Sequence, residues 1–246
     1  MKLKHLFKLR FLGITLPIRN GPLKGKKWCV TTGIRFVRGN YVKRDTDTLS
    51  ENVSRGETVY DIGAHVGYFS VLCSEIVGRK GKVFSFEPAP MNLVFLRKHI
   101  RINGCNNVKV FDICISDTVG EGYFDNSQGS ATGHLSPKGK MKVSINTLDN
   151  LLKSGETDPP DFIKINAEGA EQSILLGCVR IIQKYHPKFL ITFHGEELKN
   201  NCINMLSQYD YKIYMTAKDA LFAMPHHTLP HEDQDFSRKE ASEGPC

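Results

Sequence analysis

The feature that most constrains this chain is an apolar run leading into two glycines, followed by a second apolar run that ends in a glutamate. The first reads TVYDIGAHVGYF at residues 58–69, and the second reads VFSFEP at residues 83–88. This pattern predicts a buried strand, a glycine-bearing turn, a helix and a further strand with an acidic residue at its carboxyl end. Such a unit is typical of nucleotide-binding sites, because glycines let the backbone approach a ligand and the acid accepts hydrogen bonds from ribose hydroxyls.

The spacing of the glycines narrows the kind of nucleotide. A dinucleotide site has the fingerprint G-x-G-x-x-G, with the pyrophosphate at the helix N-terminus. Gly63 is followed by Ala64 and then by Gly67, so this spacing is absent. Asp61 would repel a pyrophosphate, but it suits a ligand with a positively charged amino-acid part, such as S-adenosylmethionine. The alternative is a strand-to-helix turn in which Asp61 caps the helix and no ligand binds.

Four blocks of sequence resemble the FkbM family of S-adenosylmethionine-dependent methyltransferases. They are DIGAHVGY at 61–68, FEP at 86–88 with Asn92 and Leu96 downstream, SINTLD at 144–149, and DFIKINAEGAE at 161–171. The first two blocks are shared by many methyltransferases. The last is the most distinctive, because family members read much like I-K-I-D-V-E-G-A-E there. The resemblance extends over roughly residues 35–193.

The resemblance implies a fold and a reaction. The fold is α/β, a Rossmann-like class I methyltransferase fold with a mostly parallel central sheet, helices on both faces and an N-terminal extension. The reaction is methyl transfer from S-adenosylmethionine, with oxygen as the expected acceptor atom. The resemblance implies hydroxyls on glycans or small metabolites as acceptors, sometimes carboxyls, and nothing in this sequence selects among them.

The rest of the chain alternates expected strands and helices, as a mostly parallel sheet requires. We expect helices at 45–55, 67–77, 90–103 and 197–208, and one helix that carries 174–185 and stops at Pro187. Strands are expected at 108–113, 162–166, 189–194, 211–215 and 220–223. Strands at 123–124 and 141–145 flank a polar, glycine-rich insertion at 117–140, which is either a lid over the acceptor or a surface hairpin.

The expected division of the chain has three parts. Residues 1–50 form an extension with a β-hairpin over 27–43, residues 51–224 form the cofactor-binding domain, and 225–246 form a polar tail. The tail contains His226, His227, His231 and Glu232, which are either solvated or, less favoured, metal ligands. We expect no metal site.

The expected cofactor contacts follow the strand ends. Asp61 is placed at the methionine end of S-adenosylmethionine and Glu87 on the ribose hydroxyls. The turn beneath the cofactor consists of Gly63, Ala64, His65, Val66 and Gly67, and His65 is expected to orient backbone or cofactor. Pro88 and Met91 are expected against adenine, with Asp112 or Ser116 in reach of it.

The expected catalytic residues are Asn166, Glu168, Lys164 and His194. The resemblance implies an aspartate at position 166, and Asn166 cannot act as a carboxylate base. Glu168 and His194 are then the candidate general bases, because a histidine titrates near neutrality. The alternative role for His194 is to cap the next helix. Lys164 either steadies an anion in the site or forms a structural ion pair with Glu168 or Glu171.

Composition limits the setting of the chain. The formal charge of +7 favours anionic partners. The sequence gives no strong nucleic-acid-binding signal, since it has no arginine–aromatic motif of the RNA-binding kind. Seven scattered cysteines with no C-x-x-C pair argue against a disulfide framework or zinc site and fit a reducing, cytoplasmic setting. No run is apolar enough for a membrane span. The basic, apolar segment at 1–12 either folds back on the core or touches a membrane surface.

Two other functions remain open at this point. A cofactor-binding protein of the same fold without catalysis is suggested by Asn166. A nicotinamide-dependent oxidoreductase would use a related fold, but the missing G-x-G-x-x-G spacing argues against it.

Overall fold

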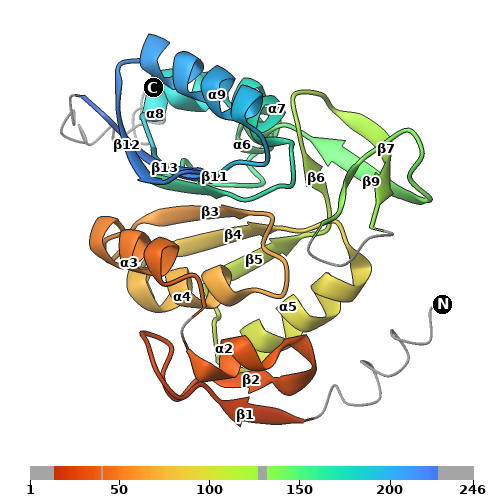
Figure 1. Ribbon diagram of the computed structural model, residues 1–246, viewed down its shortest axis with the longest axis vertical. Coiled ribbons are helices and arrows are strands. Elements are labelled where there is room, and N and C mark those ends of the chain that lie inside the picture. Colours follow the sequence, from red (N-terminus) through yellow and green to blue (C-terminus); the bar gives the residue numbers. More distant parts are fainter. Residues whose placement is uncertain (1–13, 40, 127–131, 227–246) are drawn as a thin grey trace, which may run out of the picture.

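The computed structural model describes residues 14–39, 41–126 and 132–226, and its centre is a seven-stranded sheet (Figure 1). The strands are β3 (Thr58–Ile62), β4 (Lys82–Phe86), β5 (Val108–Phe111), β10 (Phe162–Ile165), β11 (Lys188–Thr192), β12 (Tyr211–Ala217) and β13 (Ala220–Pro225). Their order is β12-β13-β11-β10-β3-β4-β5. The strands from β11 to β5 are parallel, whereas β13 is antiparallel to β11 and β12. The predicted mostly parallel sheet is confirmed, with an antiparallel hairpin at one edge.

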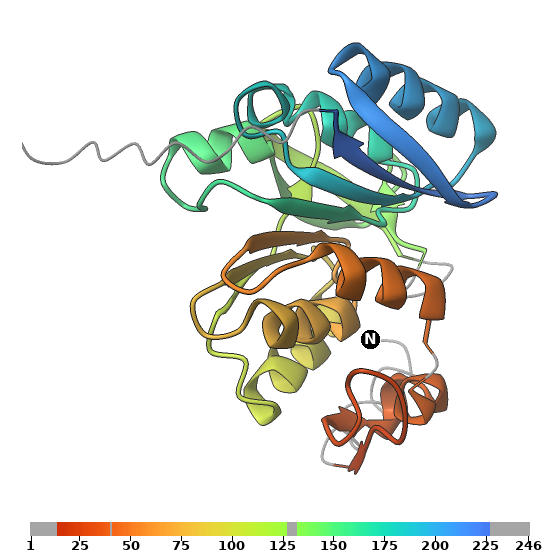
Figure 2. The same ribbon diagram turned by 90° about the vertical axis from the view of Figure 1, so that its left-hand side faces the viewer.

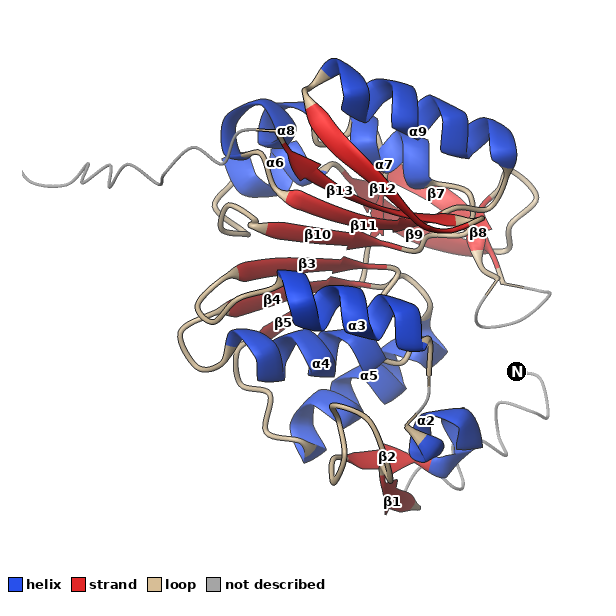
Figure 3. Ribbon diagram, turned by 60° about the vertical axis from the view of Figure 1, so that its left-hand side comes forward, coloured by secondary structure: helices blue, strands red, loops and turns tan. Residues whose placement is uncertain are grey.

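Helices cover both faces of the sheet (Figure 3). One face carries α3 (Lys43–Asn52), α4 (Tyr68–Val77) and α5 (Pro90–Ile102); the other carries α6 (Leu148–Lys153), α7 (Glu171–Leu176), α8 (Val179–Tyr185) and α9 (Glu196–Gln208). Alternate residues of β3 pack into the hydrophobic cores on the two faces of the sheet. Val59 packs with α4 on one face, while Tyr60 and Ile62 pack with α8 and α9 on the other. Asp61 therefore lies on the α4 face.

The predicted single helix over 174–185 is wrong. The chain forms α7 and α8 instead, with the break at Gly177 and Cys178. A Cβ atom at position 177 would lie only 2.1 Å from the carbonyl oxygen of Ser116. Glycine at this position lets the loop after Ile115 lie directly against the break.

The N-terminal residues form a small unit below α4 and α5 (Figure 2). Strands β1 (Thr15–Pro17) and β2 (Lys27–Cys29) pair antiparallel, and a 3₁₀ turn at Val30–Thr32 leads to α2 (Ile34–Arg38). The predicted hairpin over 27–43 is wrong after Cys29, because the chain turns helical. Phe36 and Val37 are neighbours and both buried, which a helix on the core allows and a strand with one wet face does not.

The insertion forms a second sheet beside the first (Figure 1). Its strands are β6 (Cys114–Ile115), β7 (Gly120–Asp125), β8 (His134–Leu135) and β9 (Met141–Asn146), in the order β6-β9-β7-β8. The predicted strands at 123–124 and 141–145 are confirmed. Residues 127–131, the middle of the expected lid, lie outside the described residues, as do 227–246 of the expected tail. The division of the chain at residues 50 and 225 stays a prediction.

Candidate active site

A cavity of about 310 Å³ lies at the carboxyl ends of β3, β4 and β10. It is lined by residues 62–66, 86–88 and 166–168, which end or directly follow these three strands. Parts of the chain outside the main sheet close its sides: α2 contributes Arg35, and the small sheet contributes Phe124 and His134. Ligands of open α/β sheets bind at this end of the strands.

The turn after β3 is fixed by close backbone contacts. Gly63 has a φ of 72°, a left-handed conformation that favours glycine. A Cβ atom there would lie 1.9 Å from the backbone oxygen of Asn166. The N–H groups of Gly63 and Ala64 both donate to the carbonyl of Phe86, at 3.1 Å each. These contacts hold the ends of β3, β4 and β10 around one cavity.

Glu87, directly after β4, is buried and lines the cavity. Its Oε2 accepts from the backbone N–H of His65 at 2.8 Å, and its Oε1 accepts from Ala89 N–H at 2.9 Å and from Asn92 Nδ2 at 3.1 Å. Burial raises the pKa of this carboxyl, and the three donors oppose that rise. Because a carboxylate oxygen can accept two hydrogen bonds, Oε2 keeps an acceptor position for a ligand hydroxyl.

Asp61 does not line the cavity. Its side chain is fully buried, and its Oδ1 accepts from Lys164 Nζ at 2.9 Å while its Oδ2 accepts from Ser70 Oγ at 2.7 Å. Ser70 in turn accepts from Ser85 Oγ at 2.9 Å. The structure does not place Asp61 in direct reach of a ligand's ammonium group, because Lys164 already neutralises its charge.

Lys164 forms an ion pair that the sequence does not predict. It forms neither of the expected ion pairs, with Glu168 or Glu171, but pairs with Asp61. Its ammonium also lies 3.2 Å from the carbonyl oxygen of Gly63 and 5.1 Å from the ring centre of Phe69. Lys164 is only 3% exposed, yet part of it borders the cavity. Its contact with the carbonyl oxygen of Gly63 stabilises the turn.

The N-terminal unit is fastened to the same turn through His99 of α5. Its Nδ1 lies 2.7 Å from the carbonyl oxygen of Val66, and its Nε2 accepts from the N–H of Cys29 at 3.0 Å. The ring stacks on Trp28 with 3.7 Å between centroids. Burial lowers the pKa of His99 to about 4, so the ring is neutral and donates from Nδ1.

Three of the four predicted catalytic residues gather at one edge of the cavity. Asn166 and Glu168 line it, whereas His194 stands behind Glu168 with 3.2 Å between Nε2 and Oε1. Nδ1 of His194 lies 2.8 Å from Oε1 of the fully buried Glu171. The hydrogen bond with Glu171 raises the pKa of His194, against the effect of burial. Glu168 has a φ of 49°, so a left-handed turn directs the chain here.

The remaining predicted cofactor residues divide into two groups. Ala64, His65, Val66 and Pro88 line the cavity, whereas Gly67, Met91, Asp112 and Ser116 do not. Asp112 is exposed and lies 3.6 Å from Arg97, Ser116 Oγ donates to Asp117, and Met91 packs on the apolar core. The structure gives no support to an adenine contact by these last three residues.

Sequence reasoning missed the side walls of the cavity. Arg35 belongs to α2, Tyr41 lies between α2 and α3, and Phe124 belongs to β7 of the second sheet, all outside the strand ends of the main sheet. The only signal was the aromatic and basic composition of the stretch IRFVRGNY at 34–41. Because the sequence predicts a hairpin over 27–43, it does not indicate that these side chains face the cavity.

Neither a metal centre nor a membrane span is present in the part of the chain that the structure describes. Among these residues, no three His, Cys, Asp or Glu side chains are grouped as metal ligands. None of the described helices is long and apolar enough to cross a bilayer. Of the seven cysteines, six lie within the described ranges; all six are buried, and no disulfide joins any two of them.

Solved structures share this fold. A methyltransferase FkbM from Methylobacillus flagellatus KT aligns over 70% of this chain and 44% of its own, with a TM-score of 0.54 and 21% identity. A precorrin-6y C5,15-methyltransferase from Geobacter metallireducens GS-15 aligns over 76% and 90%, with a TM-score of 0.50 and 13% identity. The chain therefore has the class I S-adenosylmethionine-dependent methyltransferase fold.

A curated relative is similar in sequence. The hexuronic acid methyltransferase AglP of Haloferax volcanii is 29% identical over 138 residues, which are 55% of this chain and 55% of the relative. The chain thus spans about half the length of the curated relative it matches. The model of the methyltransferase FkbM domain matches residues 61–213, from the aspartate of β3 to β12. By this match, which covers more than half of its length, the chain belongs to the FkbM methyltransferase family.

Proposed function

We propose that the protein methylates a hydroxyl group of an acidic sugar, free or within a glycan, with S-adenosylmethionine as the methyl donor. The observation that carries the proposal is the position of Glu87. This buried carboxylate borders the cavity, is held in place by three donors and keeps an acceptor position on Oε2. A ribose needs such a fixed acceptor.

The lining residues fit S-adenosylmethionine in two further respects. Ile113 and Phe124 provide apolar surface in the cavity lining, suited to adenine. Gly63 and Ala64 both line the cavity and carry only one methyl group between them, so a ligand can approach the backbone of the turn closely. When bound, S-adenosylmethionine supplies an electrophilic methyl group.

Glu168 is the residue we assign to proton removal from the acceptor hydroxyl. Glu168 lines the cavity, whereas His194 does not. The sequence predicts both residues as candidate general bases, and this difference favours Glu168 as the residue that contacts the acceptor. The hydroxyl proton passes to Glu168 and from its Oε1 to Nε2 of His194, 3.2 Å away. The imidazolium then lies between the carboxylates of Glu168 and Glu171, which is why its pKa is raised. Asn166 orients the acceptor hydroxyl through its amide.

The sugar class rests on the curated relative, which acts on hexuronic acid. The formal charge of +7 supports an anionic acceptor. Asn166 and Glu168 line the cavity of about 310 Å³ and are the residues we assign to the sugar acceptor.

Turnover of the purified protein tests the proposal. The experiment measures formation of S-adenosylhomocysteine with free and glycosidically linked hexuronic acids, and with the matching neutral hexoses. We expect turnover with a uronic acid and little with the neutral sugar. Glu87→Ala should lower cofactor affinity, whereas Glu121→Gln, which removes an exposed carboxylate on β7, should not.

A cofactor-binding protein without catalysis is the second candidate, and Asn166 is the observation that favours it. It predicts tight binding of S-adenosylhomocysteine and no turnover with any sugar. Binding without turnover of a broad acceptor panel, by a protein in which Asn166→Asp brings turnover back, would decide for this candidate.

A further inference from the structure

Arg35 is a cation on the cavity wall that no carboxylate of the described residues neutralises. It belongs to α2, outside the segment matched by the family model. Its guanidinium carbon lies 5.2 Å from the ring centre of Phe36 and 4.9 Å from that of Tyr41. The ion pairs within the described ranges do not include Arg35.

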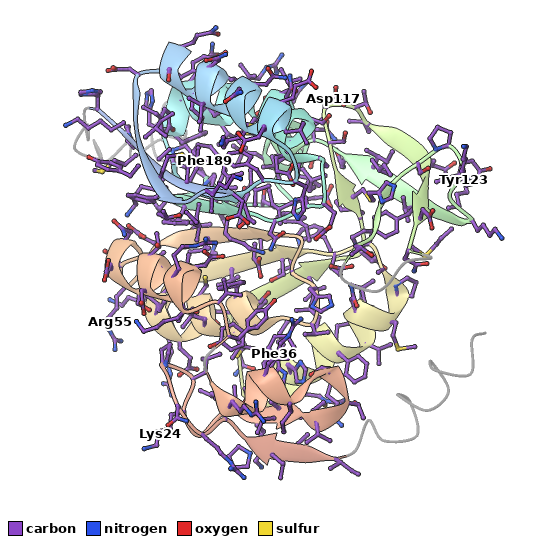
Figure 4. The ribbon with its side chains drawn as sticks, viewed as in Figure 1. Lys24, Phe36, Arg55, Asp117, Tyr123 and Phe189 are labelled. Carbon is purple, nitrogen blue, oxygen red and sulfur yellow. The ribbon has the colours of Figure 1, made fainter. Side chains whose placement is uncertain are left out.

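The aromatic rings that carry Arg35 are themselves anchored beside the glycine turn. Tyr41 contacts Tyr68 at 5.1 Å and Phe69 at 6.1 Å between ring centres, and Phe36 contacts Tyr68 at 5.9 Å. Tyr68 and Phe69 are the first two residues of α4. Phe36 is buried, and Figure 4 places it where α2 faces the rest of the protein. The guanidinium is therefore held at the α4 end of the turn.

Glu87 lies beside the middle of the same turn, through its bond to the N–H of His65. The cavity lining thus includes a hydrogen-bond acceptor, Glu87, and a guanidinium, Arg35, at separate places along the turn. Asp61 is withdrawn from the cavity into its ion pair with Lys164. A ligand with hydroxyls at one end and a carboxylate at the other matches this arrangement, since guanidinium groups bind carboxylates with paired hydrogen bonds.

We infer that Arg35 binds the carboxylate of the cofactor's amino-acid part. The inference rests on the proposed function, because it takes S-adenosylmethionine as the cofactor. It assigns part of the cofactor site to the N-terminal extension, and so to residues that the family match does not include. An acceptor carboxylate is the competing ligand, but Asn166 and Glu168, which receive the acceptor, follow β10 and not α2.

Calorimetry with two adenosine ligands tests the inference without catalysis. S-adenosylhomocysteine carries the carboxylate, whereas methylthioadenosine has the adenosine part and lacks the amino acid. Arg35→Gln should weaken binding of S-adenosylhomocysteine by roughly 10-fold or more, as expected for loss of a charged hydrogen bond, and leave methylthioadenosine affinity unchanged. Arg35→Lys should give an intermediate loss, because an ammonium keeps the charge but not the planar pair of donors.

Arg38→Gln is the matched control. It removes the same charge from the same helix at an exposed position that does not line the cavity. We expect wild-type affinity for both ligands. Equal loss of both ligands in Arg35→Gln would mean a structural effect on the turn and would overturn the inference, as would unchanged affinity for S-adenosylhomocysteine. Failure of the wild-type protein to bind S-adenosylhomocysteine would instead refute the proposed function.

Discussion

Lys164 and Asp61 stand side by side on adjacent parallel strands, in register, with their charged groups 2.9 Å apart and almost no exposure to solvent. The register is what permits the pair, because β10 and β3 present the two residues to the same face at the same height. The ammonium also reaches the carbonyl oxygen of Gly63, so the pair links the two central strands to the turn that borders the cavity.

Removal of one partner of this pair should destabilise the protein strongly. Asp61→Asn or Lys164→Met leaves a buried charge without its counterion, which typically costs about 3–5 kcal/mol. The double variant should recover part of that loss, because neither charge then remains. Urea denaturation of the four proteins measures the coupling free energy, and additive losses would show that the two charges do not depend on each other.

The same pair changes the expectation for cofactor affinity. If Asp61 contacted the ligand directly, Asp61→Asn and Lys164→Met would act in opposite directions on an ammonium group. In the structure both act through the turn, so both should weaken binding of S-adenosylhomocysteine. Stronger binding in Lys164→Met would restore the direct role for Asp61.

Replacement of Gly63 by alanine should be far more costly than a change of backbone preference. The new Cβ would lie 1.9 Å from the backbone oxygen of Asn166, so β3 and β10 would have to move apart. Gly155 is a matched control, with a φ of 73° and no atom within 4 Å of the added Cβ. Gly155→Ala should cost only about 1–2 kcal/mol, the penalty of a left-handed residue. Thermal denaturation compares the two variants, and similar losses would show that the contact with Asn166 relaxes easily.

The buried ring of His99 should make the protein less stable in mild acid. Its pKa is lowered from 6.5 to about 4, so between these values the unfolded chain binds a proton that the folded chain does not. Stability from this residue is present above pH 6.5 and is lost as the pH falls to about 4, by about 3 kcal/mol in total.

Urea denaturation of the wild type and of His99→Phe across this pH range tests the assignment. The variant should be less stable at neutral pH, because Val66 and Cys29 lose their partner, but its stability should fall less steeply with acid. His134→Asn, at an exposed position, should keep the wild-type slope. Equal slopes in wild type and His99→Phe would exclude His99 as the source.

The sequence predicted the strand ends correctly because the apolar runs and glycines are local signals. Glu87 lies where the sequence predicted it, directly after β4 and on the cavity. Asp61 forms a buried ion pair with Lys164 instead of the predicted contact with the cofactor. The sequence does not indicate this pair, because Lys164 is about a hundred residues away and only the strand register brings the two side chains together. Arg35 was missed because its direction depends on α2, whose helical form is set by packing of Phe36 and Val37 on a distant core.

The order of Asn166, Glu168 and His194 at the cavity predicts the pH dependence of the reaction. If the proton passes from Glu168 to His194, turnover requires the neutral imidazole. The rate should then rise with pH through an ionisation above the ordinary histidine value, since Glu171 raises the pKa of His194. His194→Asn should remove this limb and lower the maximal rate by roughly 10²–10⁴-fold, the usual contribution of a general base.

Glu168→Gln should lower the rate at every pH, because Glu168 stands between the acceptor and His194. Asn166→Asp should keep turnover or improve it, since a carboxylate there adds a second proton acceptor on the cavity wall. Rates of the chemical step, measured in single turnovers across pH 6 to 10 for the wild type and the three variants, separate these cases. A pH limb that survives in His194→Asn would assign the ionisation to another group. Unchanged rates in both His194→Asn and Glu168→Gln would leave positioning of the acceptor as the source of catalysis.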